Sequence, residues 1–177
     1  LPASSAASDV YKRQLYHAAI ERVPESRTLH NNKVVDLLAI GSEMVRGEIL
    51  YRQAMYDEAY AALRRAIVFE DNLPYDEPWG WMQPVRHALG ALLLEQGHTA
   101  EAEAAFREDL GLGGQLARAT VHPDNVWALK GLHDCLKARG ETVEIVQVRQ
   151  RLDLAQARAD GAFAASCFCA QAARPSN

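Results

Sequence analysis

The sequence lacks a long hydrophobic run and contains few cysteines. Its longest apolar candidate, residues 88–94, spans only seven residues and includes Gly90, whereas a membrane-spanning helix needs about 20. The three cysteines are an odd number without the spacing of a disulfide framework. We therefore expect no membrane partner, no disulfide scaffold and a location in the reducing cytoplasm. The alternative is secretion through a signal lost with the N-terminus.

The sequence also lacks an excess of basic residues. It holds 19 Lys and Arg against 23 Asp and Glu, a net charge of −4, and a nucleic-acid-binding protein needs a basic surface. The glycine-rich residues 111–114 follow an expected helix and not a strand, so they are typical of a helix end and not of a phosphate loop. We expect no nucleic-acid partner.

A spacing of 43 residues recurs through the chain. Ala54, Gly97 and Gly140 share one register. Three further registers have the same spacing: Gly47, Gly90 and His133; Leu50, Leu93 and Leu136; and Ala59, Ala102 and Ile145. Self-similarity at a fixed period indicates stacked structural repeats.

Apolar residues three and four positions apart predict a pair of helices within each period. We expect an all-α chain in which residues 33–160 form three antiparallel helical hairpins, with turns near Ala54, Gly97 and Gly140. Asp124 is the expected cap of the fifth of these helices, and Thr142 opens the sixth. Residues 15–32 are then a remnant of an upstream helical element, and residues 161–177 a C-terminal tail.

The first 14 residues are set aside. Residues 4–14 resemble the in-frame translation of a transposon-based sequencing adapter, and the alternative is a natural Ser/Ala-rich start. In either case we expect residues 1–14 to be disordered. The adapter interpretation implies that the chain is a fragment of a longer protein.

Each hairpin resembles the tetratricopeptide repeat (TPR). The second carries the small and large packing residues of that family at Leu89, Gly90, Leu93, Gly97, Ala102 and Phe106, and the first carries them at Gly47, Tyr56, Ala59, Leu63 and Ala66. The third departs from the pattern, with His133 at a small position and Arg149 at a large apolar one. The resemblance implies a right-handed α-solenoid that binds its ligand in a concave groove.

Residues 73–84, 86–90, 122–127 and 166–169 resemble, more closely, the C-terminal part of a group of bacterial TPR proteins of undefined activity. This second resemblance covers roughly residues 29–169. It implies further repeats upstream and no known reaction.

The candidate binding residues lie on the outward side of the first helix of each hairpin. Mixed charges with aromatic anchors suit a peptide, and the alternative is an ordinary solvated helix face. The residues are Met44, Glu48, Tyr51, Arg52, His87, Glu95, Trp127, Lys130, Asp134 and Lys137, with Ala91 beside them.

The loop of residues 73–83 carries Trp79 and Trp81 between prolines. The pair could form an aromatic ligand platform, but we favour a role in covering the gap between hairpins. Asp76 and Glu77 are adjacent and so cannot flank a substrate from opposite sides, which favours turn and cap roles over an acid–base pair.

Metal ligands are available without a specific spacing, so we expect no metal and no cofactor. Cys-x-Cys is closer than a zinc-ribbon pair, and two residues separate the side chains of a helical His-x-Cys by about 200°. Cys135 is an expected buried structural thiol, and Cys167 and Cys169 are expected on an exposed tail. The potential ligands are His87, His122, His133, Cys135, Cys167 and Cys169.

These features favour a protein- or peptide-binding scaffold without catalytic residues. One alternative is part of an enzyme or metal-dependent binding protein whose active residues lie mainly upstream. A structural self-association module is the other.

Overall fold

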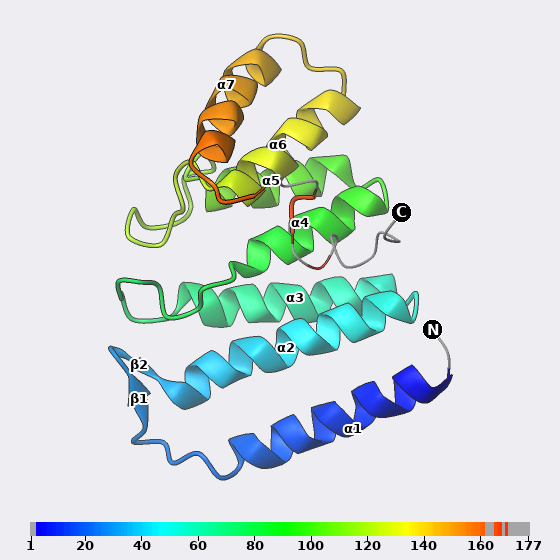
Figure 1. The fold of residues 1–177 in the computed structure, drawn as a ribbon, viewed down its shortest axis with the longest axis vertical. Helices are drawn as coiled ribbons and strands as arrows, with labels where there is room; N and C mark the ends of the chain where they lie inside the picture. The colour runs from blue at the N-terminus through cyan, green and yellow to red at the C-terminus, as the bar shows by residue number, and fades with distance from the viewer. Residues whose placement is uncertain (1–2, 162–164, 168, 170–177) are drawn as a thin grey trace. The chain divides into compact units, whose positions relative to one another are not determined.

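The structure, a computed structural model, describes residues 3–161, 165–167 and 169. Within them the chain is mostly helical, with one short antiparallel ribbon, as Figure 1 shows. The helices are α1 (Ala3–Ile20), α2 (Val34–Arg52), α3 (Tyr56–Asp71), α4 (Val85–Glu95), α5 (Thr99–Asp109), α6 (Val126–Ala138) and α7 (Glu144–Ala157). Strands β1 (Thr28–Leu29) and β2 (Asn32–Lys33) pair with each other.

The chain divides into two compact units, Leu1–Met82 and Gln83–Asn177, which are described separately. In the first unit α2 packs against α3, and in the second α4 packs against α5 and α6 against α7. The prediction of an all-α chain with paired neighbouring helices is therefore confirmed. None of the described helices combines the length and the apolar composition that crossing a membrane requires.

The start of the chain differs from expectation. Helix α1 begins at Ala3 and so includes most of the segment that we expected to be disordered, while residues 1–2 lie outside the described part. Three alanines near its start favour helix over coil. The Tyr16 hydroxyl donates to the Leu38 carbonyl at 2.9 Å, which attaches α1 to α2. Most of the expected tail, residues 162–164, 168 and 170–177, lies outside the described residues.

The three hairpin turns have the same backbone structure at a spacing of 43 residues. Ala54, Gly97 and Gly140 adopt φ values of 60°, 82° and 72°, in the left-handed region. One residue further on, the N–H groups of Met55, His98 and Glu141 donate to the carbonyls of Leu50, Leu93 and Leu136 at 2.9–3.0 Å. This pattern is the Schellman motif, which supplies donors to the last carbonyls of a helix. The repeat found in the sequence is therefore a repeat of helix-ending turns.

Phe106 is the central packing residue of the second unit. Its side chain is fully buried, and its ring lies between two glycines, Gly90 of α4 and Gly131 of α6. A Cβ atom added to Gly90 would lie 2.6 Å from the ring, and one added to Gly131 only 2.2 Å from it. The two glycines thus allow α4 and α6 to approach the same aromatic ring from α5.

The first unit has the same kind of contact between α2 and α3. A Cβ atom added to Gly47 would lie 2.8 Å from the Leu63 side chain, which is fully buried. The third hairpin lacks it, because His133 replaces the glycine and Arg149 of α7 is exposed. Of α7, only Val148 and Leu152 are buried among the described residues.

We predict opposite effects for exchanges at two equivalent turns. Gly97→Ala should lower the free energy of unfolding by about 1 kcal/mol, because a Cβ atom is sterically strained at a left-handed φ. Ala54→Gly should raise it by up to about 1 kcal/mol by removing that cost. Urea unfolding followed by circular dichroism measures both, and a shift of both variants in one direction would contradict the assigned turns.

We also predict that Gly90→Ala destabilises the protein by about 1–3 kcal/mol through overpacking against Phe106. A loss of stability is informative, because without the contact to Phe106 the change from glycine to alanine in a helix would raise stability by about 1 kcal/mol. Combined with Phe106→Leu, the substitution should cost less than the sum of the two single effects. Additive losses in urea unfolding would show that the ring and the glycine do not share the contact.

Candidate functional site

Asp109 holds a buried pair of histidines at the end of α5. His87 Nε2 of α4 lies 2.8 Å from Asp109 Oδ2, and His122 Nδ1 lies 2.8 Å from Oδ1. All three residues are buried, with exposures of 1–7%. A carboxylate only accepts hydrogen bonds, so both ring nitrogens must carry protons and donate.

The charge of Asp109 depends on these bonds. Burial alone would raise the pKa of its carboxyl, but the hydrogen bonds from His122 and His87 outweigh it and hold that pKa below its usual value. The His122 N–H also donates to the Asp109 carbonyl at 2.6 Å. Asp109 therefore fixes the loop of residues 110–125 to α4 and α5.

The sequence did not lead us to expect this cluster, and His122 was considered only as a potential metal ligand. One signal was available: Asp109 is an acidic residue in the last turn of a helix, where the helix dipole disfavours it. It also lies three positions after Phe106, on the same side of the helix. An acid in such a place needs a partner from another element.

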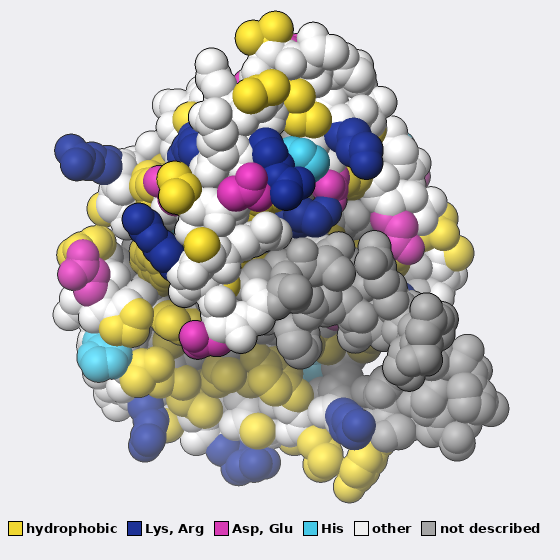
Figure 2. Space-filling model, turned by 45° about the horizontal axis from the view of Figure 1, so that its top comes forward, with side chains coloured by type: hydrophobic (Ala, Val, Ile, Leu, Met, Phe, Trp, Pro, Cys, Tyr) yellow, Lys and Arg dark blue, Asp and Glu magenta, His cyan; other side chains and the backbone are white. Residues whose placement is uncertain are grey.

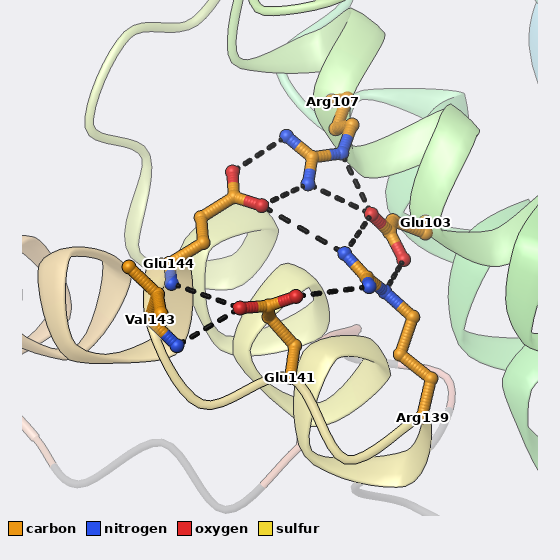
Figure 3. Close-up of polar contacts among 6 residues, drawn as sticks. All are labelled: Glu103, Arg107, Arg139, Glu141, Val143 and Glu144. Atoms are coloured by element: carbon orange, nitrogen blue, oxygen red, sulfur yellow. Dashed lines mark hydrogen bonds and ion pairs between the residues drawn. The ribbon is translucent and has the colours of Figure 1, made fainter.

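A second polar cluster joins α5 to the turn between α6 and α7, as Figure 3 shows. Arg107 donates to both carboxylate oxygens of Glu144, at 2.8 and 2.6 Å, and to Glu103 at 2.8 Å. Arg139 donates to Glu103 at 2.8 Å and to Glu141 at 3.3 Å. The hydrogen bond with Glu144 is the largest cause of the raised pKa of Arg107, and it lowers the pKa of Glu144. These charges are used in holding helices together.

Two expected caps are taken by neighbouring residues. Asn125, and not Asp124, caps α6, because its side chain accepts from Trp127 N and Ala128 N. Glu141 accepts from the N–H groups of Val143 and Glu144 at the start of α7. These bonds lower the pKa of Glu141. Asn125 directly precedes α6, and at α7 the side chain of Glu141, which is longer than that of Thr142, reaches the free N–H groups.

Several residues of the expected groove are buried. Met44 lies under Trp81, whose Nε1 is 3.2 Å from the Met44 sulfur. Tyr51 packs against the rings of Tyr56 and Tyr60, with ring centroids 5.1 and 6.4 Å away. His87 is bound to Asp109, and Ala91 is buried as well. Periodicity along one helix indicates which residues share a face, but not what covers that face.

The other groove residues remain at least partly accessible. Arg52, Glu95 and Lys137 are exposed, and Glu48, Trp127, Lys130 and Asp134 are partly exposed. Burial raises the pKa of Glu48, and the nearby Arg52 opposes this effect. On α6, Lys130 pairs with Asp134 one turn further on. That these residues bind a ligand stays a prediction.

The tryptophan loop is anchored within the first unit. Trp81 packs over Gly41 and Met44 of α2, whereas Trp79 is 40% exposed. Asp76 is buried and accepts from the Asn31 N–H and the Asn32 side chain, both at 3.2 Å. These contacts support a positioning role for Trp81 and Asp76.

The cysteines give no open nucleophile in the described part of the chain. Cys135 is buried as expected, and burial raises its pKa to about 12, so it is a thiol at neutral pH. Cys167 and Cys169 were expected on an exposed tail, but both are buried and joined by a disulfide. Among the described residues, no three His, Cys, Asp or Glu side chains are placed to hold a metal ion.

Comparison of the chain with protein-family models, with curated proteins and with solved structures gives no match.

We predict that Asp109→Asn lowers the free energy of unfolding at neutral pH by about 1–3 kcal/mol, because the buried imidazoles lose their charged acceptor. The carboxyl has a lower pKa when folded than its unfolded value of about 3.9. Its stabilising effect is therefore complete above about pH 4 and is lost as the pH falls toward the folded pKa. The variant should lose less stability than the wild type on acidification.

The control is Asp153→Asn, which alters an exposed carboxylate paired with Arg149 on α7. Urea unfolding at a series of pH values measures both variants, and the control should follow the wild type. If the free energy of unfolding of Asp109→Asn equals that of the wild type at each pH, the cluster does not stabilise the fold.

Proposed function

We propose that the chain is a TPR-type scaffold, a right-handed α-solenoid that binds a protein or peptide segment. The support is the recurrence of one turn structure at Ala54, Gly97 and Gly140, together with the packing of α5 on the next hairpin's α6. Stacked repeats of this kind form extended binding surfaces. A cytoplasmic location belongs to the same proposal: the low cysteine count favours it, and the single disulfide opposes it.

The face of α6 is the part of the predicted groove that best suits a peptide. Trp127, Lys130, Asp134 and Lys137 lie three, four and three positions apart and so share one side of the helix. The opposite side is buried through Leu129, Leu132 and Leu136. This partly exposed row with an aromatic residue at one end is the observation that carries the proposal, because aromatic anchors dominate binding energy.

The charges of this face favour a peptide that is itself of mixed charge. Lys130 and Asp134 form a pair of opposite sign, and Lys137 adds a positive charge one turn later. Figure 2 likewise shows basic and acidic side chains lying next to one another on one face of the molecule. Glu48 and Arg52 of α2 and Glu95 of α4 are the corresponding polar residues of the other hairpins.

The test is selection from a random displayed peptide library on the full chain, followed by affinities from fluorescence anisotropy. Selected peptides should bind Trp127→Ala at least about tenfold more weakly, since an anchor residue is lost. Acidic peptides should also lose affinity for Lys137→Glu. The matched control is Lys33→Glu, which makes the same charge change at an exposed residue of the first unit.

Two outcomes would contradict the proposal. Selection could enrich no peptide above a scrambled set, or the enriched peptides could bind Trp127→Ala as tightly as the wild type. Sedimentation velocity at the assay concentration separates peptide binding from self-association, the remaining use of such a surface.

A further inference from the structure

A surface hollow of about 380 Å³ lies where α6 begins and α7 ends. Its volume is at the lower end of the range of about 300–1,000 Å³ for small-molecule sites. The lining residues all belong to the second unit, and they are Asp124, Val126, Arg151, Leu154, Ala155, Arg158 and Ala159.

The hollow carries more positive than negative charge. Arg151 donates from Nε to Asp124 Oδ1 at 2.7 Å, which uses one of the five N–H donors of its guanidinium. For the Arg158 guanidinium, the described part of the chain contains no carboxylate within ion-pair distance. Two guanidiniums and one carboxylate leave a net charge of about +1.

Side chains, and not helix dipoles, decide the sign of this charge. Val126 is the first residue of α6, and Ala155, Arg158 and Ala159 lie at the end of α7. A positive and a negative helix end therefore meet at the hollow, and their opposite partial charges offset each other.

The remaining lining is aliphatic. Leu154 is 62% exposed and lines the hollow, so its apolar surface is accessible to a ligand. Val126, Ala155 and Ala159 complete an apolar wall beside the two arginines. A ligand with a short aliphatic part would remove this surface from water while its charged end meets the guanidiniums.

We propose that this hollow binds a small organic carboxylate with a short branched aliphatic part. A planar carboxylate matches the fork of a guanidinium, so Arg158 can bind both oxygens while Arg151 contributes its remaining donors. A single negative charge balances the net positive charge of the hollow, whereas the two negative charges of a phosphate dianion would exceed that positive charge. The site lies outside the row on α6 and does not depend on peptide binding there.

The experiment titrates the full chain with isovalerate and follows backbone amide shifts by NMR. The amides of Ala155 and Ala159 should shift in a saturable manner. Isovaleramide has the same shape without the charge, and it should cause no saturable shift. Inorganic phosphate has the charge without the aliphatic part, and it should bind more weakly than isovalerate.

Arg158→Gln should weaken isovalerate binding at least about tenfold, because it removes the guanidinium that binds both carboxylate oxygens. Arg158→Lys should lie between this variant and the wild type, because it keeps the charge and loses the fork. Arg149→Gln is the matched control on the same helix: Arg149 pairs with Asp153 outside the hollow, so binding should be unchanged.

Three results would overturn the proposal: equal binding of isovaleramide, stronger binding of phosphate, or equal losses in Arg158→Gln and Arg149→Gln. Amide spectra of each variant without ligand show whether it is folded, and Arg158→Lys serves as the second variant if Arg158→Gln is not.

Discussion

The arrangement of the second unit depends on the close approach of two glycines to one aromatic ring. Gly90 and Gly131 leave room for Phe106, and without them α4 and α6 could not both pack against α5 at this distance. The burial of Phe106 has a further consequence. Asp109 lies three positions later on the same side of α5, so packing the ring inside also takes a carboxylate inside. A buried charge needs partners, and His87 and His122 supply them.

The third hairpin is held by different forces, because its sequence departs from the repeat at the two packing positions. His133 and Arg149 cannot form the contact that Gly90 and Phe106 make. In its place, Arg107 and Arg139 link Glu103 of α5 to Glu141, which precedes α7, and to Glu144, the first residue of α7. Partly exposed ion pairs are weaker than core packing and are screened by salt. Added salt should therefore weaken the ion-pair part of this attachment, while the packing of the buried Val148 and Leu152 of α7 should remain.

The sequence was a good guide to features that are local along the chain. Helix ends and turns depend on bonds between residues three to five apart, so the register of Ala54, Gly97 and Gly140 was enough to place them. Some local features were still missed, among them helix α1 and the cap of α6 by Asn125. Most of the other missed features join residues far apart. His87 and Asp109 are 22 positions apart, and Met44 and Trp81 are 37 apart. Such contacts depend on the path of the long loops, which periodicity does not describe.

The same distinction explains the mixed outcome for the expected groove. A helical period shows which residues share a face, but burial depends on what other segments cover it. Trp81 covers Met44, and α3 covers Tyr51 with two further rings. The corresponding row on α6 stays partly open, with Trp127 and Lys137 at its two ends. Variants in the accessible row on α6 can therefore test peptide binding without disturbing the core.

The two proposed sites of the α6–α7 hairpin differ in how their charges are used, and this difference sets what each can recognise. On α6, Lys130 is paired with Asp134, so a ligand that binds either must compete with an existing contact. Affinity there must come mainly from burying Trp127. In the hollow, Arg158 and the spare donors of Arg151 need no such exchange. A carboxylate would thus gain more binding free energy at the hollow than on α6. An apolar anchor would gain more binding free energy on α6.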